Sequence, residues 1–302
     1  MKRAWAALMV MGVVLALGLW AVSAPAPLLT GIELKDGDAA RGKIIFDAGG
    51  CASCHMTKGQ EDRLQLGGGR ELKSPFGVFV APNISSHQRD GIGAWNVRDL
   101  VNAMKRGVSP KGEHYYPAFP YTTYARARIG DIADLMAYLR TLPAVETRAA
   151  DHRLSFPFNL RRGLGLWKAL YFDASELPAV EGESAELARG RYLTEALAHC
   201  AECHSGRDLF GGIRAGQRYA GGPDLEGDGF VPNITQHESA LGKWSLKDID
   251  YLLERGAVPD GDYVGGSMAD VVNNMAELPA ADRAAIAAYV KSLPPLPTSP
   301  KK

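Results

Sequence analysis

The sequence has few cysteines, no net charge and no cluster of basic residues. Its 302 residues include four cysteines, and Lys plus Arg balance Asp plus Glu at 34 each. Proteins that bind nucleic acid usually carry basic patches interleaved with aromatic side chains, so we expect no nucleic-acid partner. The length suffices for two or more domains, and the hydrophobic content of 46% supports packed cores.

A phosphate-binding loop is also missing. The run Gly67–Gly69 is followed by Lys73, but Leu72 stands where such a loop requires glycine, and no strand precedes the run. We therefore interpret these glycines as turn residues. The sequence shows no constellation suited to hydrolysis or phosphoryl transfer.

All four cysteines lie in two copies of one short motif. The stretch Cys51-Ala-Ser-Cys54-His55 returns as Cys200-Ala-Glu-Cys203-His204. Two thiols followed at once by an imidazole suit covalent haem attachment, because each thiol can form a thioether and the histidine can ligate the iron. The motifs predict two covalently bound haem c groups. The attachment residues are Cys51, Cys54, Cys200 and Cys203, and the iron ligands are His55 and His204.

Two other kinds of site use paired cysteines. A thioredoxin-like C-x-x-C does not require the following histidine, and it would occur in a βαβ pattern, which the sequence lacks. A zinc site would have to join Cys54 and Cys203 across most of the chain, whereas zinc ligands normally lie much closer in sequence. Haem attachment therefore remains the preferred interpretation.

The amino terminus predicts a membrane anchor. Lys2 and Arg3 precede an uncharged apolar run from Ala4 to Ala24, which as a helix would be about 30 Å long and could cross a bilayer. The alternative is a cleaved signal peptide, because residues 22–24 resemble a cleavage site. The proline at position 25 and the length of the run favour an uncleaved anchor. Both alternatives export the remaining chain.

An internal repeat of about 149 residues sets the domain organisation. The matching stretches include Arg41-Gly42 with Arg189-Gly190, Pro82-Asn83-Ile84 with Pro232-Asn233-Ile234, Trp95 with Trp244, and residues 137–143 with 288–294. We predict an anchor over residues 1–30, a first domain over 31–147, an ordered linker over 148–182, a second domain over 183–297 and a tail over 298–302. The aromatic middle of the linker should pack against both domains, and Arg161 or Arg162 could contact a haem propionate or make a surface ion pair.

Each copy predicts three main helices joined by long loops. The first helix begins near Asp38 or Ser184, which are suitable N-caps. The second covers 97–106 or 246–255 and ends at a glycine, and the third ends before a proline. Long Gly- and Pro-rich loops around few helices fit a chain that wraps a haem, since the porphyrin supplies much of the apolar core.

The two copies differ where a sixth iron ligand is expected. Methionine opposite histidine raises the potential of a haem. Met268 lies 64 residues after His204, but Phe119 lies at the same distance after His55 and cannot ligate iron. We therefore predict Met268 as the sixth ligand of the second haem.

The sixth ligand of the first haem stays open. His114 is near Phe119 in sequence, although it could instead bond a loop carbonyl or a propionate. Met104 corresponds to Leu253, which favours a core position. His87 has a counterpart in the Met-ligated copy and is therefore a poor candidate. The first iron could also be five-coordinate.

The sequence resembles bacterial membrane-anchored multihaem cytochromes c related to the cytochrome subunits of periplasmic alcohol and gluconate dehydrogenases. The resemblance rests on both C-x-x-C-H motifs, both Pro-Asn-Ile motifs, residues 74–77, 107–110 and 116–121, and Gly266-Ser267-Met268. It implies an all-α fold with two tandem class I cytochrome c-like domains behind a transmembrane helix. Such relatives typically carry three haem domains, and they commonly have methionine where Phe119 stands.

These observations predict an electron-transfer protein and not an enzyme. Electrons would enter from a periplasmic dehydrogenase and leave toward the respiratory chain, in a protein held by one helix in the bacterial inner membrane with its haem domains in the periplasm. The alternative is a dihaem enzyme, peroxidase-like or acting on another small ligand, with an open coordination site on the first haem. A haem-based sensor is a weaker alternative because the sequence shows no signalling domain.

Overall fold

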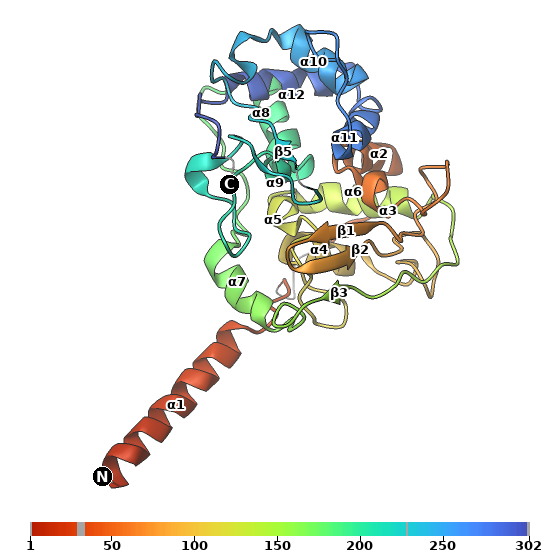
Figure 1. The fold of residues 1–302 in the computed structure, drawn as a ribbon. Helices are drawn as coiled ribbons and strands as arrows, with labels where there is room; N and C mark the ends of the chain where they lie inside the picture. Colours follow the sequence, from red (N-terminus) through yellow and green to blue (C-terminus); the bar gives the residue numbers. More distant parts are fainter. Residues whose placement is uncertain (1, 29–33, 228, 301–302) are drawn as a thin grey trace.

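The computed structural model describes residues 2–28, 34–227 and 229–300. A long N-terminal helix leads into two repeats that pack against each other (Figure 1). The first repeat contains α2 to α6 and the second α8 to α12, with α7 between them. The predicted boundary between residues 30 and 31 lies outside the described residues, as do the last two residues of the predicted tail.

Helix α1 (Lys2–Val22) projects away from both repeats (Figure 1). It is wholly exposed, and its mean hydropathy of 2.2 and length of 21 residues make it able to cross a membrane. Such an exposed apolar helix near the N-terminus is typical of a membrane anchor or of a signal sequence.

Three helices in each repeat occupy the predicted positions. They are α2 (Ala39–Ala48), α4 (Val97–Arg106) and α6 (Ile129–Leu139) in the first repeat, and α8 (Ala185–Tyr192), α10 (Leu246–Arg255) and α12 (Ala280–Ser292) in the second. The side chains of Asp38 and Ser184 cap α2 and α8 as expected. Gly107 and Gly256 end α4 and α10 with φ of +56° and +74°, a backbone conformation that glycine adopts readily.

The first and third helices of each repeat cross at a glycine. A methyl group at Gly42 would lie 2.0 Å from the carbonyl oxygen of Asp134, and one at Gly190 would lie 1.8 Å from that of Ala285. A bidentate ion pair stabilises each helix crossing. Arg41 donates to Asp134 over 2.7 and 2.9 Å, and Arg189 donates to Asp282 over 2.9 and 2.7 Å. The Arg-Gly pair found in both copies thus serves helix packing.

Gly190→Ala is expected to force α8 and α12 apart. The new methyl group has no space beside the backbone of Ala285, so the free energy of unfolding should fall by about 1–3 kcal/mol, as in overpacked cores. Thermal or denaturant unfolding of the haem-loaded protein measures this. Gly130→Ala is the control, because no atom lies within 4 Å of its added methyl group. Equal stability of the two variants would contradict this packing role.

A π-helical turn precedes the second cysteine motif. The sequence offset between copies is 148 at Arg41 and Arg189 but 149 at Cys51 and Cys200. Residues Leu193–Leu197 form the π turn, in which Ala198 N donates to Leu193 O over 2.7 Å. A π turn accommodates one extra residue without breaking the helix. It keeps the second motif in register despite the insertion.

The predicted all-α fold is only roughly correct, because the structure also contains two small antiparallel sheets. The strands are β1 (Glu71–Ser74), β2 (Gly77–Val80) and β3 (Arg153–Leu154) in one sheet, and β4 (Gly222–Pro223) and β5 (Phe230–Val231) in the other. The additional short helices are α3 (Cys51–His55), α5 (Tyr121–Tyr124), α7 (Gly163–Tyr171), α9 (Cys200–Cys203) and α11 (Ser267–Met275). Strands of two to four residues are too short to show an alternating pattern.

The linker contacts both repeats, as the sequence predicted. Lys168 in α7 donates to the carbonyls of Arg106 and Gly107 in the first repeat over 2.6 and 2.8 Å. Trp167 donates to the carbonyl of Phe210 in the second repeat over 3.0 Å. Because α7 bonds to both, the linker restricts the relative position of the two repeats.

Candidate functional site: two cysteine-histidine motifs

Each cysteine-histidine motif forms one short helical turn. The residues before α3 and α9 are Gly50 and His199, and both have left-handed backbones with φ of +62° and +43°. This conformation suits glycine, and among other residues histidine is one of the more tolerant. Both motif helices therefore begin after a residue with a left-handed backbone, even though only the first copy has glycine at that position.

The two motif histidines are held by equivalent hydrogen bonds. His55 Nδ1 lies 2.8 Å from the carbonyl oxygen of Pro82, and His204 Nδ1 lies 2.7 Å from that of Pro232. A carbonyl oxygen only accepts, so Nδ1 carries the proton and Nε2 keeps its lone pair. Burial lowers the pKa of both histidines, and the carbonyl bond partly offsets this. A neutral imidazole oriented through Nδ1 is the form that ligates a metal.

The asparagine of each Pro-Asn-Ile motif fixes the segment that carries this carbonyl. Asn83 donates to the carbonyls of Val145 and Thr147 over 2.7 and 2.8 Å, and Asn233 donates to that of Leu296 over 2.8 Å. Each asparagine also accepts from the backbone two residues later. Both asparagines are buried. The asparagine of each motif therefore fixes the segment whose proline carbonyl accepts the hydrogen bond from the motif histidine.

Asn233→Ala should destabilise the second repeat by about 1–3 kcal/mol, because it leaves buried backbone groups without partners. Unfolding of the haem-loaded protein, followed by haem absorbance, measures the change. Asn273→Ala removes an exposed asparagine side chain of α11 and serves as the control. If both variants unfold alike, the segment does not depend on Asn233.

The four cysteines are free thiols that are partly or fully exposed. Surrounding protein nevertheless raises the pKa of Cys51 and Cys200 to about 12 and that of Cys203 to about 11. A thioredoxin-like site needs a thiol of lowered pKa, so the raised values oppose that alternative.

Two arginines that the sequence analysis missed hold the middle of each motif. Arg70 donates to the carbonyl oxygen of Ser53 over 2.7 Å, and Arg207 donates to that of Glu202 over 2.6 Å. Ser53 and Glu202 occupy the same position in their motifs. Arg70 follows its motif by 15 residues and Arg207 by three, so no shared spacing could have revealed their common role.

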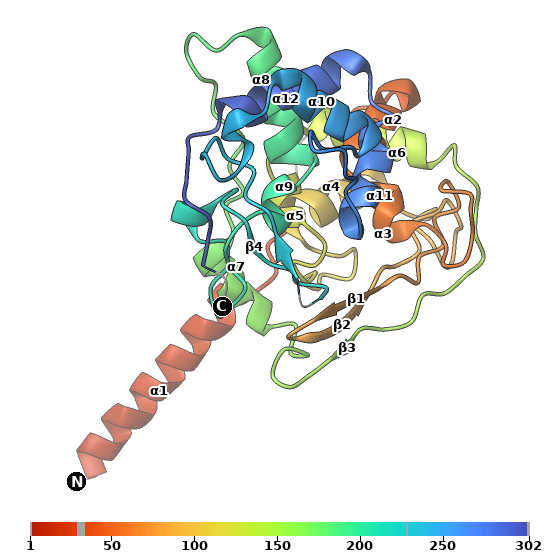
Figure 2. The same ribbon diagram turned by 45° about the horizontal axis from the view of Figure 1, so that its top comes forward.

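Each motif helix packs against the other repeat (Figure 2). In α3, the hydroxyl of Ser53 accepts from Asn274 of α11 over 2.5 Å and donates to the Asp270 carbonyl over 3.4 Å. In α9, Glu202 accepts from Thr122 and Thr123 of α5 over 2.7 and 3.1 Å. Helix α5 begins shortly after Phe119, and α11 contains Met268 in its first turn. Each motif helix therefore contacts the helix near the expected sixth-ligand position of the other repeat.

The centre of this arrangement brings the two motifs together directly. A methyl group at Gly50 would lie 3.7 Å from His199 Nε2. Tyr124 donates to the carbonyl of Gly49 over 2.7 Å, and its ring meets the His199 ring edge-on at 5.9 Å. His199 thus links the residue before Cys200 to the residues before Cys51.

The two positions predicted to face the irons, Met268 and Phe119, have different surroundings. Met268 is half-buried in the first turn of α11. Phe119 is also half-buried and packs with Tyr115 and Tyr124, each at a ring distance of 5.7 Å. An aromatic cluster therefore occupies the region of the first repeat where a methionine would be expected.

The other candidates for the first iron have roles within the protein. His114 is buried, and its Nε2 lies 3.0 Å from the carbonyl oxygen of Ser23, so it holds the segment after α1. Met104 is buried in the core, as its counterpart Leu253 suggested. His87 Nδ1 accepts from the backbone of Asp90 over 3.1 Å. A sixth ligand for the first haem remains unassigned.

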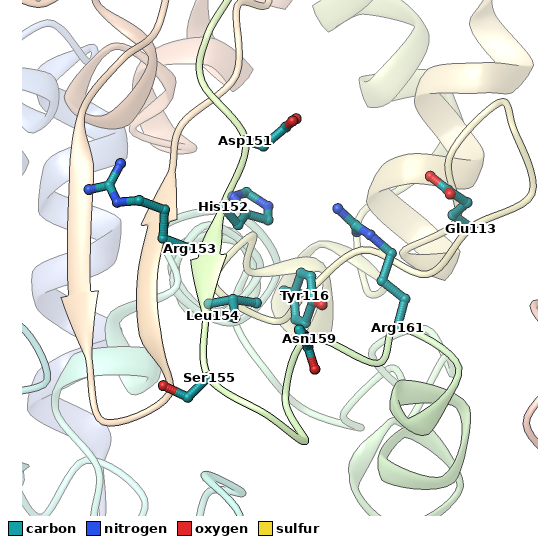
Figure 3. Close-up of a pocket in the computed structure, with 9 residues that line it drawn as sticks. All are labelled: Glu113, Tyr116, Asp151, His152, Arg153, Leu154, Ser155, Asn159 and Arg161. Atoms are coloured by element: carbon teal, nitrogen blue, oxygen red, sulfur yellow. The ribbon is translucent and has the colours of Figure 1, made fainter.

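The arginines considered for propionate binding instead contact aromatic rings. Arg161 lies 4.8 Å from the centre of the Tyr116 ring and donates to the carbonyl of His114. It lines an open cavity of about 760 Å³, where it extends past Tyr116 toward His152 (Figure 3). Arg162 lies 4.0 Å from the centre of the Trp20 ring at the end of α1. Both positions stiffen the linker.

Comparison with known proteins decides what kind of site this is. The sequence matches the cytochrome c family twice, over residues 39–143 and 187–294, and each match includes one motif. The chain belongs to the cytochrome c family. The two matches fall within the predicted domains, and the protein binds two haem c groups covalently.

Three relatives illustrate this family membership. The cytochrome is 49% identical to a dihaem cytochrome c-type protein of Cereibacter sphaeroides over 286 residues, 92% of this chain and 94% of that protein. It is 34% identical to the cytochrome c subunit of the alcohol dehydrogenase (quinone) of Gluconobacter oxydans, over 93% of this chain and 60% of that subunit. It is 31% identical to the gluconate 2-dehydrogenase cytochrome c subunit of Pantoea cypripedii, over 86% and 60%. The resemblance seen in the sequence is confirmed, and the chain spans about three fifths of the two dehydrogenase subunits.

The residues around the motifs fit the haem groups. Each motif offers two free thiols and one histidine whose hydrogen bond to the described residues is made by Nδ1, which leaves Nε2 for a metal.

Proposed function

We propose that this cytochrome transfers electrons between two haems held in one rigid unit. The observation that carries the proposal is the exchange of contacts between repeats, because α3 rests on α11 and α9 on α5. We assign Cys51, Cys54 and His55 to the first haem and Cys200, Cys203, His204 and Met268 to the second. These residues lie in the two class I cytochrome c-like domains predicted over 31–147 and 183–297.

The haem iron supplies the one-electron chemistry, and the protein sets its surroundings. Pro82 and Pro232 orient the histidines, whose Nε2 would ligate iron. Arg70 and Arg207 fix the motif backbones from outside. His199 packs beside Gly50 and Tyr124, so the residues that would hold the two haems lie in one connected unit.

The proposed electron donor is a periplasmic dehydrogenase, and the proposed acceptor belongs to the respiratory chain. The donor is supported by the relatives that are cytochrome c subunits of dehydrogenases. The alternative, a haem enzyme with an open first iron, receives no support from them. The aromatic packing of Phe119 further favours an electron carrier, since it fills space near the first haem.

We place the protein in the bacterial inner membrane, with α1 as a single uncleaved anchor and both haem domains in the periplasm. The contacts of Ser23 support retention of α1. Ser23 is buried, its carbonyl bonds to His114 and its hydroxyl accepts from Arg162 over 3.0 Å. Cleavage after residue 24 would remove all of these contacts.

A potentiometric titration of the purified, haem-loaded full chain tests the proposal. Absorbance should follow reversible reduction and reoxidation of both haems, without loss of haem after repeated cycles. The reduced protein should not bind carbon monoxide at the second haem, where methionine is the proposed ligand. A protein that cannot be cycled between its oxidised and reduced forms is not an electron carrier.

A further inference from the structure

Helix α7 exposes an apolar face. Leu166 and Leu170 are 37% and 77% exposed, and Ala169 is exposed between them. The charged residue of the helix, Lys168, points inward and bonds to the end of α4. A helix on the surface of a soluble domain normally turns its polar side to water. Helix α7 does the opposite.

Residues from both sides of α7 extend this face. The loop before the helix exposes Phe156 by 78% and Phe158 by 43%, and a loop of the second repeat exposes Leu209 by 81% and Phe210 by 68%. We call these four residues, together with Leu166 and Leu170, the juxtamembrane surface. An exposed apolar group of this size marks an interaction site.

The parts of the juxtamembrane surface are connected. Trp167 in α7 donates to the carbonyl of Phe210. The ring of Phe76 lies 4.8 Å from that of Phe158, and its edge would be 3.5 Å from a methyl group at Gly211, next to Phe210. The two loops and α7 therefore form one surface to which both the linker and the second repeat contribute.

This surface lies at the base of α1. Gly165 of α7 touches the backbone of Ser23, where a methyl group would be 2.4 Å from Ser23 Cα. Arg162, at the start of α7, lies against the Trp20 ring. Figure 1 shows α7 running across the end of α1 and not along it. If α1 spans a bilayer, a helix fixed across its end lies along the bilayer surface.

We propose that the juxtamembrane surface rests in the periplasmic face of the same bilayer that holds α1. This inference rests on the proposed membrane anchor. Interfacial helices sink about 5–10 Å into the boundary between headgroups and acyl chains, a depth that Leu166 and Leu170 can reach from α7. The bilayer is the occupant that follows from position, because the contacts of Arg162 and Gly165 hold this face beside the exit point of α1.

The surface would fix the orientation of both haem domains. A single spanning helix alone lets a domain tilt and turn, but a second apolar contact beside it limits both motions. Helices α10 and α12 lie at the opposite end of the molecule from α1 (Figure 1). They would face the periplasm, and soluble partners would reach the cytochrome from that side.

Fluorescent labels on the haem-loaded full chain in lipid vesicles test the inference. Single cysteines are introduced by Leu170→Cys and Phe210→Cys in the surface, by Val13→Cys in α1 and by Leu246→Cys in α10 as the control. Leu246 is 51% exposed and is far from α1. Each label is an environment-sensitive dye, quenched in turn by a lipid-bound quencher and by an aqueous one.

Labels at positions 170, 210 and 13 should be quenched by the lipid-bound quencher, and the label at 246 only by the aqueous one. Aqueous quenching at 170 and 210 with lipid quenching at 13 overturns the inference and leaves the anchor intact. Protection of position 170 from both quenchers indicates a protein partner and also overturns it. Aqueous quenching at 13 contradicts the anchor and removes the basis of the inference.

Discussion

Replacing both Cys200 and Cys203 by alanine should lower the covalent haem content from two per chain to one. Without either thioether, the second haem has no covalent attachment, and the second repeat loses part of its apolar core. Intact mass and the haem-to-protein ratio of the purified chain measure the loss. The mirror variant, with Cys51 and Cys54 replaced, should also retain one haem.

Ser53→Ala is the matched control for these variants. It changes a residue inside the first motif and removes the hydrogen bonds with Asn274 and Asp270, but it keeps both thiols. Its haem content should therefore remain at two per chain. If the variant without Cys200 and Cys203 still carried two covalent haems, the assignment of the second motif would be wrong.

Met268→Leu should lower the reduction potential of one haem and leave the other unchanged. Loss of the thioether removes the ligand that raises the potential, and the expected drop is on the order of 0.1–0.2 V within the roughly 0.8 V that axial ligands span. The reduced variant should also bind carbon monoxide at the second haem. Spectroelectrochemical titration resolves the two haems.

Met275→Leu provides the comparison, since Met275 lies in the same helix but is buried in the core. This swap nearly conserves volume and should cost less than about 1.5 kcal/mol, without a change in potential. Identical potentials for the variants at positions 268 and 275 would show that Met268 does not ligate the iron.

The main helices could be predicted because their signals are local. Capping residues such as Asp38 and Ser184 and the glycines after α4 and α10 determine helix ends within one turn. The cysteine motifs were equally clear, because haem attachment requires those residue types at that spacing. Because the chain contains two copies of the repeat, each of these signals was observed twice.

The features of the site that the sequence did not predict depend on contacts between residues far apart in the chain. Arg70 and Arg207 hold equivalent carbonyls from different sequence positions, and the bond between Asn274 and Ser53 joins residues from opposite repeats. Single-sequence patterns contain no signal for such pairs. The π turn does have a signal in the sequence. The spacing between equivalent residues of the two copies changes from 148 to 149, which corresponds to one extra residue before Cys200.

The arrangement of the repeats connects the two motifs. Hydrogen bonds link α3 to α11 and α9 to α5, so each motif helix is held against the other repeat. Variants of His199 would be informative here, since this residue links both motifs directly.

One chain of this cytochrome should carry two covalent haems that both exchange electrons. Coulometric titration of the full-length protein, combined with its intact mass, tests this most directly. The expected results are the mass of the chain plus two haems and the reversible uptake of two electrons per chain. A chain with one haem, or with two haems that accept fewer than two electrons, would contradict it.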